Sequence, residues 1–199
     1  MGSSNHSHKE LKISPFTPPQ QLLKIMYSFL AIGVITFGAG IMLNPERIWT
    51  SYLTAFFYFA SLAVGAMFFI TVSNAAKAGW NVTIRRFAES MTNYIPVMLV
   101  TSFILILGFK KLYAWADPAQ LANLGGGKSI YLAPWFVVLR LTLFTVGCWV
   151  FKNLIVGNSI KQDQSGDHQL TNKNLTYSIA FIAFFAIFFS LFSLDLLMS

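Results

Sequence analysis

Long apolar stretches separated by short polar connections dominate the chain from residue 22 onward. A helix of about 20 apolar residues crosses a hydrocarbon core about 30 Å thick. Five stretches reach this length: residues 22–43, 52–72, 91–109, 134–156 and 177–198. The pattern therefore predicts an all-α fold, a polytopic transmembrane helix bundle of about five spans formed by residues 22–199.

Residues 1–21 are polar and contain three prolines, which predicts a flexible N-terminal arm. The first apolar stretch is too long for the hydrophobic core of a signal peptide, so we expect it to remain as an anchor. Lys and Arg are more frequent in the arm and in residues 73–90 and 157–175 than in the other connections. The positive-inside rule therefore predicts a cytoplasmic N-terminus, with Ser199 on the outer face.

Composition excludes several other protein classes. Hydrophobic residues make up 55% of the chain and charged residues only 11%, whereas a soluble domain carries roughly 25% charged residues. The net charge of +7 is that of a membrane protein with basic cytoplasmic loops, so we expect the lipid bilayer, and no nucleic acid, as partner.

The residues that bind redox cofactors are scarce at membrane depth. A transmembrane haem needs axial ligands inside the spans, but His6, His8 and His168 all lie in polar segments. Cys148 is the single cysteine and can form neither an intrachain disulfide nor a cysteine-ligated cluster. We therefore expect this chain to bind no metal and no redox cofactor of its own.

Arg140 and Asp195 are the ionisable residues that stand out within the predicted spans. Counted along their helices at 1.5 Å per residue, their depths differ by on the order of 6 Å, which an arginine side chain can bridge. Because a buried charge needs a partner, the sequence predicts an ion pair here, with a structural role or a role in a proton path. Alternatively, Asp195 is interfacial and Arg140 extends to the headgroups. Tyr58 adds a hydroxyl to the candidate path.

Aromatic and basic residues mark the expected membrane surfaces. Trp80, Arg85 and Arg86 lie in a segment too polar to span, which predicts an interfacial turn or a short amphipathic helix. Trp115 lies in the long connection 110–133 and is expected at the headgroups on the other side.

Four short segments resemble, in the same order, the ActF family of membrane subunits of Alternative Complex III. They are residues 74–80 (NAAKAGW), 115–118 (WADP), 127–132 (GKSIYL) and 193–199 (SLDLLMS). The resemblance extends from about Trp49 onward. In that family further helices follow the last segment, so the chain is expected to correspond to the N-terminal half of the family pattern.

The resemblance implies an NrfD-related quinone-binding subunit 2 of a bacterial respiratory quinol:electron-acceptor oxidoreductase in the inner membrane. Its expected partners are the haem-c, iron–sulfur and NrfD-like subunits, which carry the cofactors. The chain itself is expected to support quinol oxidation and proton translocation, with quinone or quinol at a subunit interface. Two other functions remain open: a small transporter or half-transporter that acts as an oligomer, and a purely structural membrane anchor.

Overall fold

The structure is a computed structural model that describes residues 18–78, 82–123, 126–165 and 169–198. It divides into two units, residues 1–43 and 44–199. The first unit contains the helix α1 (Gln20–Leu43), none of whose residues is buried. The second unit contains all the other helices.

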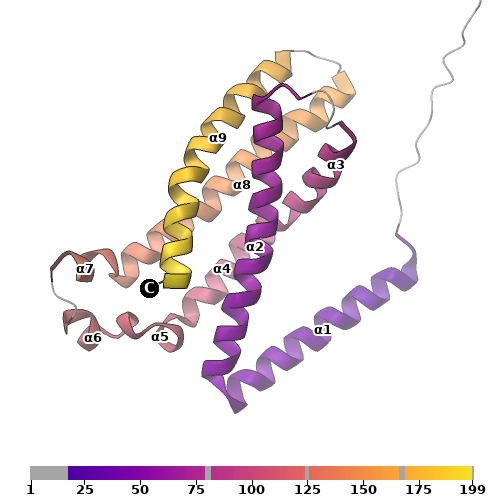
Figure 1. Cartoon of the computed structure of the whole chain (residues 1–199). Helices are drawn as coiled ribbons and strands as arrows, with labels where there is room; N and C mark the ends of the chain where they lie inside the picture. The colour runs from indigo at the N-terminus through magenta and orange to yellow at the C-terminus, as the bar shows by residue number, and fades with distance from the viewer. Residues whose placement is uncertain (1–17, 79–81, 124–125, 166–168, 199) are drawn as a thin grey trace, which may run out of the picture. The chain divides into compact units, whose positions relative to one another are not determined.

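Four long helical segments build the second unit (Figure 1). They are α2 (Pro45–Ala75), α3 and α4 (Val82–Met91 and Ile95–Leu107) with the 3-10 turn η2 (Thr92–Tyr94) between them, α8 (Pro134–Ser165), and α9 (Gln169–Ser193), which continues into the π-helical turn η4 (Leu194–Met198). The short elements α5 (Phe109–Leu112), η3 (Ala114–Ala116), α6 (Pro118–Asn123) and α7 (Gly126–Tyr131) lie between α4 and α8. The described residues contain no strand.

Five helical segments among the described residues are long and apolar enough to cross a membrane. They are Gln20–Leu43, Pro45–Ala75, Ile84–Leu107, Pro134–Gln162 and Gln169–Leu197. The predicted helical, polytopic fold is therefore confirmed. Many large apolar side chains on these segments are exposed, as expected of helices that face lipid acyl chains. This is the architecture of a multi-pass membrane protein.

The segment 74–90 differs in part from the prediction. After a turn in which Lys77 has a φ of 50°, α3 begins at Val82 and leads through η2 directly into α4. The third apolar segment therefore begins at Ile84, before the expected boundary at Met91. The boundary moves because α3 is amphipathic: its charged residues share one face, so its other face can continue the apolar surface of α4.

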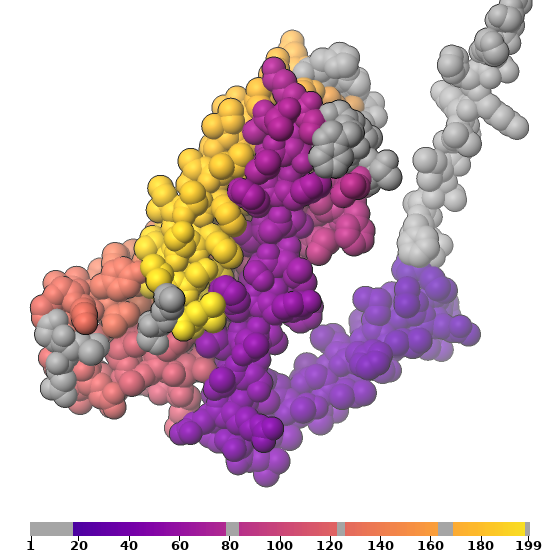
Figure 2. All heavy atoms as spheres, viewed as in Figure 1, coloured from indigo at the N-terminus to yellow at the C-terminus, as the bar shows by residue number. Residues whose placement is uncertain are grey.

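The core forms where α9 packs on both α8 and α2, while α4 packs on the same two helices. Figure 2 shows α2 and α9 lying against each other along the bundle. Phenylalanines from α2, α8 and α9 pack together in this core, such as the tilted pair Phe144 and Phe192 with ring centroids 4.6 Å apart. Gly108 lies against the ring of Trp49, where a Cβ atom would collide with the indole. Glycine at this position therefore allows α2 to approach the end of α4.

Candidate functional site

A buried ion pair lies at the end of the bundle where Figure 1 shows α5, α6 and α7. Arg140 is in the second turn of α8, and Asp195 is in η4. The Arg140 Nε donates to Asp195 Oδ2 and its Nη2 donates to Asp195 Oδ1, both at 2.7 Å. Only 7% of Arg140 and 4% of Asp195 is exposed. Two parallel charge-assisted hydrogen bonds in a dry environment hold the carboxylate and the guanidinium in one fixed geometry.

Aromatic rings and a backbone carbonyl complete the surroundings of Arg140. Its Nη2 also donates to the Tyr131 carbonyl oxygen at 3.1 Å, at the end of α7. Its guanidinium carbon lies 4.1 Å from the ring centroid of Tyr131 and 4.5 Å from that of Phe136. A guanidinium enclosed by ring faces gains cation–π attraction where water is excluded. Arg140 thus connects α7 and η4 to the start of α8.

A second contact joins η4 to the connection after α5. The Tyr113 hydroxyl donates to the Leu196 carbonyl oxygen at 2.8 Å. Trp115 in η3 stacks on Tyr113 with ring centroids 4.9 Å apart, and both residues are buried. The widened π-helical turn places Asp195 toward Arg140 while the carbonyl of the next residue meets Tyr113, and such turns occur frequently at functional sites.

Both tyrosines at this site hold their protons tightly. Burial, followed by the nearby Asp195 carboxylate, raises the pKa of the Tyr113 phenol above its ordinary value. Burial and Asp195 also raise the pKa of Tyr131, although the Arg140 charge opposes the shift. Tyr113 therefore acts as a hydrogen-bond donor at physiological pH and not as a base.

Two buried donors at this end of the bundle have no acceptor among the described residues. They are Arg140 Nη1 and Trp115 Nε1. Because leaving a buried donor unpaired costs about 1–3 kcal/mol, these groups suit water molecules or an acceptor oxygen brought by a ligand or a partner subunit. Among the described residues, the site thus offers unpaired hydrogen-bond donors, while the Asp195 carboxylate is already bonded to Arg140.

Three other residues selected from the sequence are Tyr58, Trp80 and Trp115. Tyr58 is 58% exposed on α2, and none of the described contacts of the ion pair involves it. Trp80 lies outside the described residues. Trp115 is only 4% exposed and stacks on Tyr113, because the connection after α5 folds η3 into the end of the bundle; its depth at the headgroups stays a prediction.

Arg85 and Arg86 on α3 both form ion pairs with Glu89 of the same helix. Arg85 Nε donates to Glu89 Oε1 at 3.0 Å and Arg86 Nη1 donates to Glu89 Oε2 at 2.6 Å. Ser159 on α8 also donates to Glu89 Oε1 at 2.7 Å. The buried Glu89 therefore fastens α3 to α8. Its spacing of three and four residues from the arginines was a readable signal of helical pairing, whereas its bond to Ser159 was not.

Sequence reasoning also missed Tyr113, which bonds Leu196, 83 residues later, and Tyr131, whose carbonyl accepts from Arg140 nine residues later. In the sequence both tyrosines lie in the long connection 110–133, where no pattern indicates which residue each of them contacts. Among the described residues, no group of three or more His, Cys, Asp or Glu side chains could hold a metal ion.

Comparison with known proteins adds no assignment to this geometry. No protein-family model matches the chain, and no curated protein is significantly similar to it. Function therefore has to be inferred from the sites themselves and from the resemblance of the four segments.

Proposed function

We propose that this chain is an integral membrane subunit of a bacterial quinol:electron-acceptor oxidoreductase of the Alternative Complex III type. In this role it carries no redox cofactor of its own and supports quinol oxidation within the inner membrane. Its partners are the haem-c, iron–sulfur and NrfD-like subunits, with quinone or quinol at an interface between subunits.

The observation that carries the proposal is the convergence of three of the four ActF-like segments on one site. The segment 127–132 contributes Tyr131, whose carbonyl and ring contact Arg140. The segment 193–199 contributes Asp195. The segment 115–118 contributes Trp115, which stacks on the tyrosine that bonds Leu196. Segments chosen by resemblance alone thus surround one buried ion pair.

The chemistry of the site suggests how the subunit supports the reaction. Two hydrogen bonds from Arg140 to Asp195 hold η4 in one position against the start of α8. The unpaired donors Arg140 Nη1 and Trp115 Nε1 offer positions for water or for an oxygen of a neighbouring subunit. We therefore propose that the Arg140–Asp195 pair aligns α7, α8 and η4 where another subunit binds. In this proposal the path for proton translocation runs past these three aligned elements.

Copurification is the first test. The chain would be isolated from its native membrane in mild detergent and its partners identified by mass spectrometry, together with its own intact mass. The proposal predicts haem-c, iron–sulfur and NrfD-like subunits in the preparation. Recovery of the chain alone or as a homo-oligomer would favour the transporter instead.

Variants of the ion pair separate a functional role from an anchoring role. Arg140→Met combined with Asp195→Leu removes both charges and leaves no unpaired charge buried, so the complex is expected to assemble. If the pair supports turnover, this double variant loses quinol-oxidation activity although all subunits are present. Normal quinol-oxidation rates in the assembled double variant would instead show a purely structural anchor. Lys110→Met, on the exposed side of α5, is the matched control.

A further inference from the structure

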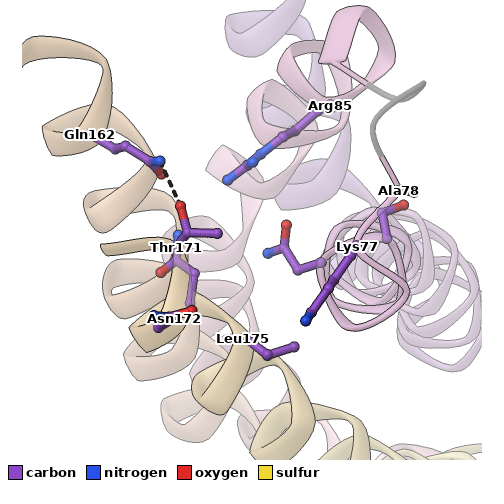
Figure 3. Close-up of a pocket in the computed structure, with 10 residues that line it drawn as sticks. Lys77, Ala78, Arg85, Gln162, Thr171, Asn172 and Leu175 are labelled. Atoms are coloured by element: carbon purple, nitrogen blue, oxygen red, sulfur yellow. Dashed lines mark hydrogen bonds between the residues drawn. The ribbon is translucent and has the colours of Figure 1, made fainter. Parts of the chain in front are cut away.

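A polar pocket lies at the other end of the second unit, where α2 and α8 end and where α3 and α9 begin. Its volume is about 400 Å³. Figure 3 shows its walls, with Lys77 and Arg85 on one side and Gln162, Thr171 and Asn172 on the other. The first ActF-like segment, 74–80, contributes Asn74 and Lys77, but neither residue takes part in the ion pair described above.

Two cationic side chains line the pocket. Lys77 and Arg85 extend toward its interior in Figure 3, and no Asp or Glu occurs among the described residues that line it. Arg85 also bonds Glu89 at 3.0 Å, which fixes the position of its guanidinium. Lys77 is exposed, and its backbone adopts a left-handed conformation. This arrangement favours an anion between the two cations.

The opposite wall offers hydrogen-bonding groups with unused capacity. Asn174 is 3% exposed; its Nδ2 donates to the Ile155 carbonyl at 3.3 Å, but its Oδ1 has no donor among the described residues. Thr171 Oγ1 accepts from Gln162 Nε2 at 2.7 Å, so its own hydroxyl proton can be donated into the pocket. A buried acceptor without a donor calls for a ligand or water that supplies an O–H or N–H group.

From the two cations and the unpaired amide oxygen we infer that this pocket binds a phosphate group whose substituent carries a hydroxyl or ammonium donor. The phosphate lies between Lys77 and Arg85, and the substituent donates to Asn174. Lysine provides a point charge and arginine a directed pair of donors, which together suit phosphate oxygens. A lipid headgroup and a small soluble phosphate ester both present this chemistry.

The surroundings of the pocket make a lipid the first ligand to test. The ends of membrane-spanning helices lie at headgroup level. Next to Arg85 on α3, the apolar residues Ile84 and Phe87 line a separate apolar groove of about 330 Å³ against α2. The same short helix thus presents a cation to the pocket and an apolar surface to the groove, as a phospholipid requires.

Lipid binding would be measured on the full chain in non-ionic detergent by native mass spectrometry. Phosphatidylglycerol and phosphatidylethanolamine carry a donor next to the phosphate, whereas phosphatidylcholine carries none. The expected order is stronger binding of the first two lipids than of phosphatidylcholine. Glycerol 1-phosphate and inorganic phosphate would be titrated in parallel by thermal shift to test the soluble source.

The decisive comparison uses Lys77→Gln and the double variant Lys77→Gln/Arg85→Gln. Each lost charge is expected to weaken binding about tenfold, as loss of a charge-assisted contact does. Lys110→Gln/Lys111→Gln removes the same number of charges from exposed positions on α5 and should leave binding unchanged. Because Lys77 is exposed, its single variant keeps the test valid if the double variant fails to fold.

Each outcome decides the inference. Donor-dependent lipid binding that Lys77→Gln weakens supports a headgroup site. Stabilisation by glycerol 1-phosphate that Lys77→Gln abolishes, without lipid selectivity, supports a soluble phosphate ester. Equal binding by wild type, Lys77→Gln and the α5 control, or no binding at all, overturns the inference. The measurement involves no quinol oxidation, so its failure is distinct from failure of the proposed function.

Discussion

Neutralising one side of the Arg140–Asp195 pair should destabilise the protein much more than removing both sides. The two N–O contacts of 2.7 Å join side chains that are almost completely buried. A single substitution, Arg140→Met or Asp195→Leu, leaves the other charge in place without its partner. Removal of one partner from a buried pair costs about 3–5 kcal/mol, which shifts the unfolding equilibrium by roughly two to four powers of ten.

The double variant Arg140→Met/Asp195→Leu should behave differently. Replacing both members by apolar residues of similar size is often neutral or stabilising, because the desolvation cost of both charges disappears. The free energy of unfolding of the double variant is therefore expected within about 1 kcal/mol of wild type. On these figures the double-mutant cycle gives a coupling energy of about 5 kcal/mol or more in magnitude.

The assay is reversible unfolding in mixed micelles with an increasing fraction of a denaturing detergent, followed by far-UV circular dichroism. Lys110→Met serves as the control for loss of an exposed charge, with an expected change below about 0.5 kcal/mol. Single variants that cost less than about 1 kcal/mol, as exposed pairs do, would refute the burial of the pair. A double variant as unstable as the sum of the singles would show that the two side chains act independently.

Three further predictions concern packing, ionisation and orientation. Gly108→Ala should cost about 1–3 kcal/mol because its methyl group collides with a buried indole, whereas Gly65→Ala meets open space and should not destabilise the fold; the same detergent titration measures both. Burial raises the folded-state pKa of Tyr113 above the ordinary value of 10.0, so the folded protein holds this proton more tightly and stability should fall as pH rises above that value. Tyr113→Phe should weaken this dependence and cost about 1–3 kcal/mol at neutral pH, because a backbone carbonyl loses its donor. Cysteines introduced at Lys161 and Lys128 should react with a membrane-impermeant maleimide only from the cytoplasmic and only from the outer side, respectively; the reverse pattern would contradict the predicted orientation.

Local sequence was sufficient for the spans because membrane crossing depends on apolar length, which is a property of consecutive residues. It also pointed to Arg140 and Asp195, since depth along a helix follows from counting residues. The spacing of Arg85 and Arg86 from Glu89 contained the signal for pairing within one helix as well. The boundary of the third span was less accurate, because the amphipathic α3 continues into α4 without a break in the helical path.

Tertiary structure decided everything that depends on rotation of a helix about its axis and on the path of the connections. Depth alone could not show that Arg140 and Asp195 face each other, or that Tyr58 faces away. The burial of Trp115 and the bond from Tyr113 to Leu196 follow from the course of the connection after α5. Ser159 meets Glu89 because of how α8 packs on α3, and Asn174 lines the polar pocket because of how α9 packs on α8. Such contacts join residues far apart in the chain, and no local pattern records them.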